Sequence, residues 1–209
     1  MESLVSCERL LNEQTPEREK GVAHVRPGQL WYFTYGGGLN ARHLLPSGIT
    51  PNVVRVVALY GYRMGFYGRM PMWDSGMETL VAEHGQIVWG VLHEVSLADS
   101  DRFDAVHDVR FDGTGSYFHY PVTVRDADGN AYAALACKKT ELGELAVPSR
   151  EYLDFLLAGG REHGLPGDYL ARLSELPCRD SAYPVPRTAL RTSPFARDPF
   201  ASDCSGCDG

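Results

Sequence analysis

A run of three glycines, Gly36–Gly38, follows the aromatic, strand-like segment at residues 30–35. Each glycine costs backbone entropy when it becomes ordered, so such a cluster normally serves a special conformation or a close approach by another group. A glycine-rich turn also exposes backbone N–H groups, which together can bind an anion. The run therefore predicts an anion-binding loop. A plain tight turn that leaves a strand is the alternative interpretation.

The residues after this loop favour a body made of strands. Residues 53–66 are rich in β-branched and aromatic side chains, with glycines that permit bends. Residues 77–83 and 86–95 are typical of a hairpin joined by the short link His84–Gly85. Residues 116–139 indicate a second hairpin, because the segment "DADGN" in its middle is a turn sequence.

Helices are expected on the outside of these strands. Ser96 and Asp99 have capping-box spacing at the start of a helix over residues 96–108. After the N-cap Ser149, a second helix runs to Gly164, and a third helix follows it. The economical assembly is a curled mixed sheet or small barrel with helices packed outside it.

The length of 209 residues suits one domain with two arms. Residues 1–29 form the expected N-terminal arm, with a short helix around Leu4–Leu11. The domain then covers residues 30–176. Residues 177–209 are rich in Pro, Ser and Asp and lack periodicity, which predicts an extended arm or tail.

The composition excludes several classes of partner. The net charge is −7 and no dense stripe of Lys and Arg is present, so neither nucleic acid nor an anionic membrane is expected to bind. No secretory signal and no apolar run of spanning length are found. Five scattered cysteines do not indicate a disulfide framework, and a cytoplasmic protein with reduced thiols is expected.

No metal or other cofactor is expected. The seven histidines lack the spacing of metal ligands. Cys204 and Cys207 have ligand spacing, but a structural zinc ion needs four ligands and this tail offers two. His119 shares one expected strand face with Tyr117 and could line a pocket, although a surface or core role is the commoner one.

Three stretches, in this order, resemble the gamma-glutamylcyclotransferase family. "YFTYGGGLN" is similar to the family's strand-then-loop signature, and "VWGVLHEVSLADSDRFDAV" is similar to a strand that leads into a helix with an acidic end. "PSREYLDFLLAGGREHGLPGDYLARLSEL" resembles the family's C-terminal helices. The resemblance implies an α+β fold, a small, partly closed mixed β-barrel flanked by helices.

The resemblance also implies a reaction. The α-amine of a γ-glutamyl group attacks its own γ-carbonyl, and 5-oxoproline forms with release of an amine or amino acid. The amine must lose a proton as it attacks, which requires a carboxylate general base. The developing oxyanion and the substrate carboxylate need fixed N–H donors. The implied partner is therefore a small γ-glutamyl molecule, bound by a monomer or a homodimer.

The family pattern assigns the site residues. Asp104 stands where the family has its catalytic Glu, so it is the expected general base. Tyr117 matches a tyrosine that borders the pocket. The residues expected to cradle the carboxylate or carbonyl of the glutamyl group are Tyr35, Gly36, Gly37, Gly38 and Leu39.

Departures from the family pattern keep a second hypothesis open. Asp104 is one methylene shorter than Glu, about 1.5 Å of reach, and a misplacement near 1 Å can cost about 100-fold in rate. Gly37 and Gly38 replace the family's Ser and Asn, and Asn40 could supply an amide instead. The alternative is thus a non-catalytic relative that binds a ligand or a partner. For the cyclotransferase hypothesis itself, the departures suggest an unusual substrate, such as a small specialised metabolite that carries a γ-glutamyl group.

Other carboxylates compete with Asp104 for the role of base. Glu78 and Glu94 lie on expected strands, where alternation with apolar neighbours more often directs such a group to solvent. Asp74 lies in an expected loop at the edge of the pocket. Each of the three is a weaker candidate than Asp104.

Overall fold

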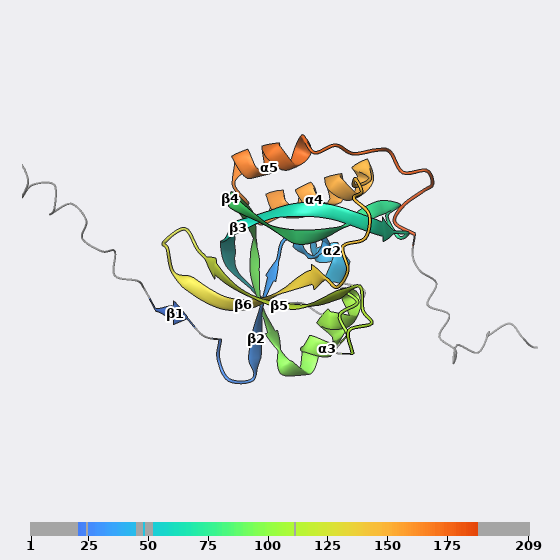
Figure 1. Ribbon diagram of the computed structural model, residues 1–209. Helices are drawn as coiled ribbons and strands as arrows, with labels where there is room; N and C mark the ends of the chain where they lie inside the picture. Colours follow the sequence, from blue (N-terminus) through green and yellow to red (C-terminus); the bar gives the residue numbers. More distant parts are fainter. Residues whose placement is uncertain (1–20, 24, 45–47, 49–51, 111, 188–209) are drawn as a thin grey trace, which may run out of the picture.

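The computed structural model describes residues 21–23, 25–44, 48, 52–110 and 112–187. These residues form a mixed β-barrel with helices on its outside, which confirms the expected α+β class (Figure 1). The elements in chain order are β1 (Val22–Ala23), β2 (Gln29–Thr34), the 3₁₀ turn η1 (Gly37–Leu39), α2 (Ala41–Leu44), β3 (Asn52–Met70), β4 (Ser75–Ser96), α3 (Leu97–Val106), β5 (Tyr117–Arg125), β6 (Ala131–Lys139), α4 (Arg150–Glu162) and α5 (Gly167–Ser174).

The strands are arranged in the order β1-β6-β2-β4-β3-β5, and pairing between β5 and β6 closes the barrel. β6 runs parallel to β1 and β2, whereas the other neighbours are antiparallel. The seam between β3 and β5 is narrow, because Ala58 and Arg125 are its one register pair. The barrel is therefore mixed and only lightly closed along that seam, as expected.

The prediction of a hairpin turn at His84–Gly85 is wrong. The chain continues through these residues as one strand, β4, and both of its halves pair with β3. The register changes from Tyr60↔Ile87 to Tyr62↔Ala82, so residues 83–86 bulge outward with Gly85 at φ +79°. An exposed polar bulge with a left-handed glycine has the same sequence pattern as a turn. The true reversal lies at residues 71–74.

The expected helices form and begin at the expected caps. The Ser96 hydroxyl accepts a hydrogen bond from the Asp99 amide (3.2 Å) at the start of α3. The Ser149 hydroxyl accepts from the Tyr152 amide (3.2 Å) at the start of α4 and donates to the Trp73 carbonyl (2.7 Å). This second contact ties α4 to the tip of the β3–β4 hairpin.

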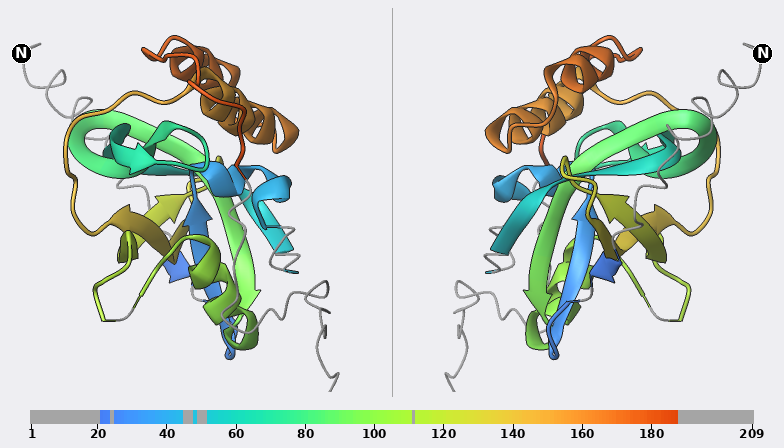
Figure 2. Two further views of the ribbon diagram at one scale, coloured as in Figure 1. Left: turned by 90° about the vertical axis from the view of Figure 1, so that its right-hand side faces the viewer. Right: turned by 90° about the vertical axis from the view of Figure 1, so that its left-hand side faces the viewer.

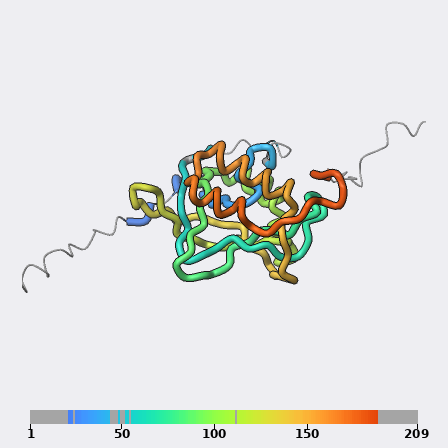
Figure 3. Tube along the Cα trace, turned by 90° about the horizontal axis from the view of Figure 1, so that it is seen from above, coloured from blue at the N-terminus to red at the C-terminus, as the bar shows by residue number. Residues whose placement is uncertain are grey.

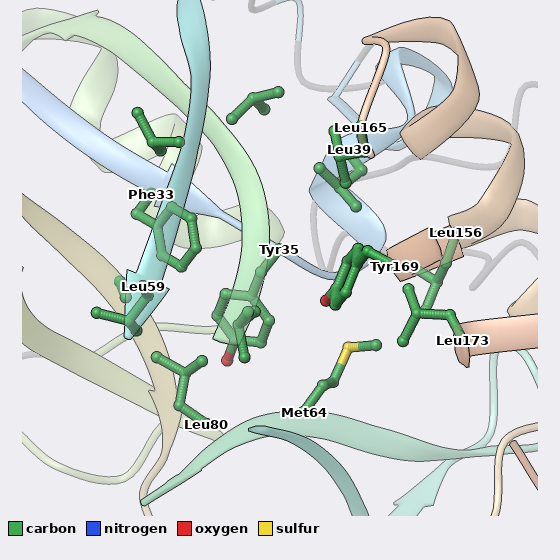
Figure 4. Packing of buried hydrophobic residues seen from close by; sticks show 14 of the residues in the cluster. Phe33, Tyr35, Leu39, Leu59, Met64, Leu80, Leu156, Leu165, Tyr169 and Leu173 are labelled. Atoms are coloured by element: carbon green, nitrogen blue, oxygen red, sulfur yellow. The ribbon is translucent and has the colours of Figure 1, made fainter. Parts of the chain in front are cut away.

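The core lies between the barrel and the helix pair. α4 and α5 pack side by side across the long β3–β4 hairpin, while α3 lies at the far end of the barrel (Figures 2 and 3). Phe33 and Leu80 from the strands belong to the same buried cluster as Leu156 and Leu173 from the helices, and Tyr35 and Met64 lie between the two groups (Figure 4). Burial of these apolar side chains is the main force that holds the helix pair on the barrel.

Residues 177–187 run back along α4 to the tip of the β3–β4 hairpin. Tyr183 donates a hydrogen bond to the Pro71 carbonyl (2.6 Å), and the Arg187 amide donates to the Met72 carbonyl (2.7 Å). The predictions for the N-terminal helix and for the Cys204/Cys207 tail lie outside the described residues. Among the described residues, no helix combines the length and the apolar character that crossing a bilayer requires.

Candidate active site

A cavity of about 270 Å³ opens beside the Gly36–Gly38 loop. Its walls come from every described strand except β1, from the loop, and from residues of α2, α3 and α4. Small-ligand pockets usually have volumes of about 300–1,000 Å³, so this one suits a ligand at the small end of that range. The polar and ionisable side chains on its wall are Tyr32, Thr34, Tyr35, His43, Arg69, Glu78, His107, Asp108, Ser116, Tyr117, Cys137 and Tyr152.

The three glycines are required because protein groups approach each of them closely. A Cβ atom at Gly36 would overlap the Glu78 carboxylate, and one at Gly38 would overlap the Thr34 methyl group. A Cβ atom at Gly37 would lie 2.8 Å from the Tyr152 hydroxyl oxygen. The run therefore serves close approach by protein groups, which include an acid and a phenol, and the anion-binding loop stays a prediction.

Glu78 is held directly against the loop. Its Oε1 accepts hydrogen bonds from the Gly37 amide (2.9 Å) and from the Tyr152 hydroxyl, whose oxygen lies 2.8 Å from both carboxylate oxygens. The side chain is half-buried and lines the cavity. The expectation that Glu78 faces solvent is therefore wrong. β4 carries it over the loop, a placement that strand alternation alone does not reveal.

Three phenols surround this carboxylate. Tyr152 donates to Glu78 itself, Tyr117 donates to the Glu78 carbonyl (2.9 Å), and Tyr35 donates to the Cys137 carbonyl (2.5 Å). Burial raises the pKa of each phenol well above 10, and the nearby Glu78 charge raises it further. The three side chains are therefore neutral hydrogen-bond donors at physiological pH.

Two imidazoles line the same cavity. The His107 Nδ1 atom lies 3.0 Å from the Phe103 carbonyl oxygen, and its ring is 5.5 Å from that of His43, centroid to centroid. Burial is the main cause that lowers both pKa values, to about 3 for His43. Both rings are thus uncharged at neutral pH. Sequence reasoning missed both residues, since neither belongs to a ligand motif.

Asp104 lies in a separate buried cluster. Its Oδ1 accepts from the Tyr32 hydroxyl (2.9 Å) and lies 2.8 Å from the His119 Nε2. Asp104 is only 4% exposed. Tyr32 and Phe103 are on the cavity wall, whereas the described lining does not include Asp104 or His119. The structure therefore brings Tyr35, the glycines and Tyr117 to one cavity, with Asp104 behind its wall.

Two further loop residues have structural partners. Asn40 donates from its side-chain amide to the Phe155 carbonyl (3.1 Å) and accepts from the Arg42 amide (3.1 Å). Leu39 is 1% exposed and packs in the core. These contacts anchor the loop to α4 and α2. Leu39 therefore supports the Gly36–Gly38 loop from the core, and it is not part of the described cavity lining.

The other competing carboxylates are engaged in ion pairs. Glu94 pairs with Arg26 (2.8 Å) at the far end of β4. Asp74 is buried at the hairpin tip, where Arg179 (2.9 Å) and the Ala182 amide (2.8 Å) bind its Oδ2. Arg179 holds the pKa of Asp74 well below its usual range. The ion pairs of Glu94 and Asp74 therefore give both acids a structural role.

We expect Asp74→Asn to lower the free energy of unfolding at pH 7. The folded state depresses the pKa of Asp74, so its contribution is complete above the unfolded-state value of about 3.9 and is lost as the pH falls below it. Urea denaturation at pH 7 and pH 3 checks this, and the difference between parent and variant should shrink at pH 3. Asp180→Asn is the matched control, because Asp180 makes an exposed ion pair with Arg150. Equal losses for the two variants contradict the prediction.

Comparisons with known proteins were made for sequence and for fold. A family model described as the AIG2-like family matches residues 87–173. A Bos taurus protein named gamma-glutamylcyclotransferase is 28% identical over 156 residues, which cover 71% of this chain and 79% of the bovine one. The Homo sapiens protein of that name is 25% identical over 153 residues, with coverage of 71% and 79%.

Solved structures give the same result for the fold. A structure named gamma-glutamyl cyclotransferase matches with a TM-score of 0.69 at 22% identity and covers 75% of this chain and 93% of that chain. An uncharacterized Homo sapiens protein matches with a TM-score of 0.70 at 23% identity, with coverage of 76% and 94%. Sequence and fold comparisons thus point to one group of proteins.

Proposed function

We propose that this chain is a member of the gamma-glutamylcyclotransferase family that cyclises the γ-glutamyl group of a small molecule to 5-oxoproline and releases an amine. One observation carries the proposal. A carboxylate, a glycine loop and neutral phenol donors meet at a cavity sized for a small ligand. These are the groups that intramolecular attack of an amine on an amide requires.

Each group has a role in this reaction. A carboxylate removes a proton from the α-ammonium, and the freed amine attacks the γ-carbonyl carbon to close the five-membered ring. Negative charge then develops on the carbonyl oxygen. Tyr117 and Tyr152 are neutral phenols on the cavity wall, and each gives its one O–H to Glu78 in the structure, so either would stabilise that charge only after turning its O–H toward the carbonyl oxygen. The amides of Gly36 and Gly38, which donate to no acceptor in the described part of the chain, are further donors for the substrate.

Two carboxylates remain as candidates for the base. The family pattern favours Asp104, and the geometry favours Glu78. Glu78 lines the cavity beside the loop, where the α-amine of a bound glutamyl group could reach it. Asp104 is instead hydrogen-bonded to Tyr32 and stands behind the wall. We therefore propose that Glu78 is the base and that Asp104 holds the Tyr32 hydroxyl in place.

One part of the cavity lining bears on the leaving group. Arg69, Met70, Pro71 and Met77 belong to that lining and are apolar except for one cation. This composition supports a small amine or amino acid as the leaving group. A specialised metabolite that carries a γ-glutamyl group is compatible with it.

One observation favours the alternative function, binding without turnover. The acid at the family's catalytic position, Asp104, contacts Tyr32 and His119 and is not part of the described cavity lining. A pocket whose wall does not include the acid at the family's catalytic position can still bind a glutamyl-like ligand. Such a module would be stabilised by that ligand and would release no product.

The test is a panel of γ-glutamyl amines and γ-glutamyl dipeptides incubated with the purified full-length chain. Mass spectrometry should detect 5-oxoproline from at least one of them. The α-glutamyl isomers and the N-acetylated γ-glutamyl compounds are controls, since neither presents a free α-amine to the γ-amide. Absence of 5-oxoproline from the whole panel, together with a raised melting temperature in the presence of a γ-glutamyl compound, would favour the binding module.

A further inference from the structure

We propose that His107 is a second proton-transfer residue of this site, which carries a proton from the attacking nitrogen to the leaving nitrogen. The proposal rests on the function proposed above and adds a residue to it. The family resemblance gives this position no role. Three observations carry it: the proton inventory of the reaction, the fixed orientation of the imidazole, and its position on the cavity wall.

The proton inventory requires more than one transfer. The α-nitrogen begins as an ammonium group with three protons and ends as a ring N–H with one. The leaving nitrogen begins with one amide proton and departs as an ammonium ion with two more. Two protons therefore leave one nitrogen and two reach the other, with no oxidation or reduction. A lone carboxylate must release the first proton before it can accept the second.

The orientation of His107 leaves its outer nitrogen free to accept. The Phe103 carbonyl oxygen, 3.0 Å from Nδ1, can only accept a hydrogen bond, so Nδ1 carries the proton of the neutral ring. Nε2 then presents a lone pair. The ring also stacks on the Phe103 ring, with centroids 4.7 Å apart. Together the stack and the hydrogen bond fix both the tautomer and the direction of Nε2.

Nε2 points toward the glycine loop. A side chain at Gly38 would begin 3.1 Å from this nitrogen. Both His107 and the loop line the cavity that Glu78 also borders. The attacking and leaving nitrogens are bonded to one carbon atom in the tetrahedral intermediate. One imidazole at this position can therefore accept from the first and donate to the second.

The surroundings keep His107 uncharged between turnovers. Burial lowers its pKa below 6.5, and the nearby His119 charge would lower it further. Glu78 and Asp104 act in the opposite direction, as does the Phe103 carbonyl, but burial prevails. His43, whose ring is 5.5 Å away, is neutral as well. A neutral imidazole can accept a proton at physiological pH.

In the proposed reaction, each proton that leaves the attacking nitrogen is matched by one that reaches the leaving nitrogen. Glu78 takes the first proton from the α-ammonium, and the amine adds to the carbonyl carbon. His107 Nε2 takes the second proton from the same nitrogen and becomes imidazolium. As the carbon–nitrogen bond breaks, its electron pair stays on the leaving nitrogen, which takes the proton from Nε2. The imidazole is neutral again, and Glu78 or water supplies the last proton.

The test compares leaving groups of one size and different basicity. The substrates are the γ-glutamyl amides of ethylamine and of 2,2,2-trifluoroethylamine, and the second amine needs less protonation in order to leave. For His107→Asn we expect kcat on the ethylamide to fall by about 10²–10⁴-fold. The fall in kcat on the trifluoroethylamide should be at least about tenfold smaller, because a less basic leaving amine depends less on a general acid. KM should change little for either substrate.

Controls separate this role from a structural one. His107→Asn keeps a donor for the Phe103 carbonyl, and His107→Phe keeps the ring stack, so at least one variant should retain the parent's unfolding midpoint. His84→Gln removes an exposed histidine on the β4 bulge and should leave the rates unchanged. Equal losses on both amides, or no loss, would overturn the role of His107. Failure of the parent protein to form 5-oxoproline would instead overturn the proposed function.

Discussion

Glu78→Gln is expected to lower kcat for 5-oxoproline formation by about 10²–10⁴-fold, the range that removal of a general base produces. Glutamine has the shape of glutamate and keeps an oxygen for the Gly37 amide, which lies 2.9 Å from the carboxylate. The loop should therefore keep its conformation. The variant loses only the ability to accept a proton at neutral pH. Steady-state rates with the best substrate of the panel measure this loss.

The matched comparison is Asp104→Asn. Its main expected effect is on stability, because a hydrogen bond to a charged group contributes about 1.5–3 kcal/mol and Asp104 accepts one from Tyr32 in the buried cluster. Its kcat should fall less than that of Glu78→Gln once both are assayed well below their melting temperatures. If Asp104→Asn abolishes product and Glu78→Gln does not, the family position is the base and the assignment to Glu78 is wrong.

Gly36→Ala is expected to reduce kcat by about 100-fold, the cost of displacing a reacting group by about 1 Å. The new methyl group would overlap the carboxylate and the Cγ atom of Glu78. A flexible side chain can move aside, so the fold should persist while Glu78 leaves the Gly37 amide. Kinetics and urea denaturation of the same preparation check both parts of this result.

Two further variants make the result for Gly36 specific. Gly167→Ala is the control, since nothing lies within 4 Å of a Cβ atom at that position, and it should leave kcat unchanged. In the Glu78→Gln background, Gly36→Ala should add little to the loss, because both changes act on one carboxylate. If the kcat losses of Gly36→Ala and Glu78→Gln multiply in the double variant, Gly36 does not act through the Glu78 carboxylate.

The local features of the fold could be predicted from the sequence because they depend on neighbouring residues. Ser96 and Ser149 cap their helices by accepting from amides three residues ahead. The turn between β5 and β6 forms where the sequence places it, at residues 126–130. The glycine run marked the cavity, since the need for small residues at close approach is visible in composition alone.

The side chains that line that cavity could not be predicted in the same way. Strand alternation has a period of two, so it divides residues into two faces without saying which face meets which element. Glu78 and Glu94 lie on one strand, yet one reaches the Gly37 amide and the other pairs with Arg26. This outcome follows from the continuous β4 strand. The bulge at residues 83–86 has the sequence pattern of a turn, so the sequence predicted a hairpin there.

The position of the acids is thus the main contribution of the tertiary structure. The sequence by itself determined the family resemblance, the glycine run, the helix caps at Ser96 and Ser149 and the turn between β5 and β6. Packing of α3 against β2 placed Asp104 beside Tyr32 and His119, and packing of α4 on the barrel placed Tyr152 against Glu78. These contacts join residues far apart in the chain, and only the packing of the helices on the barrel brings such residues together.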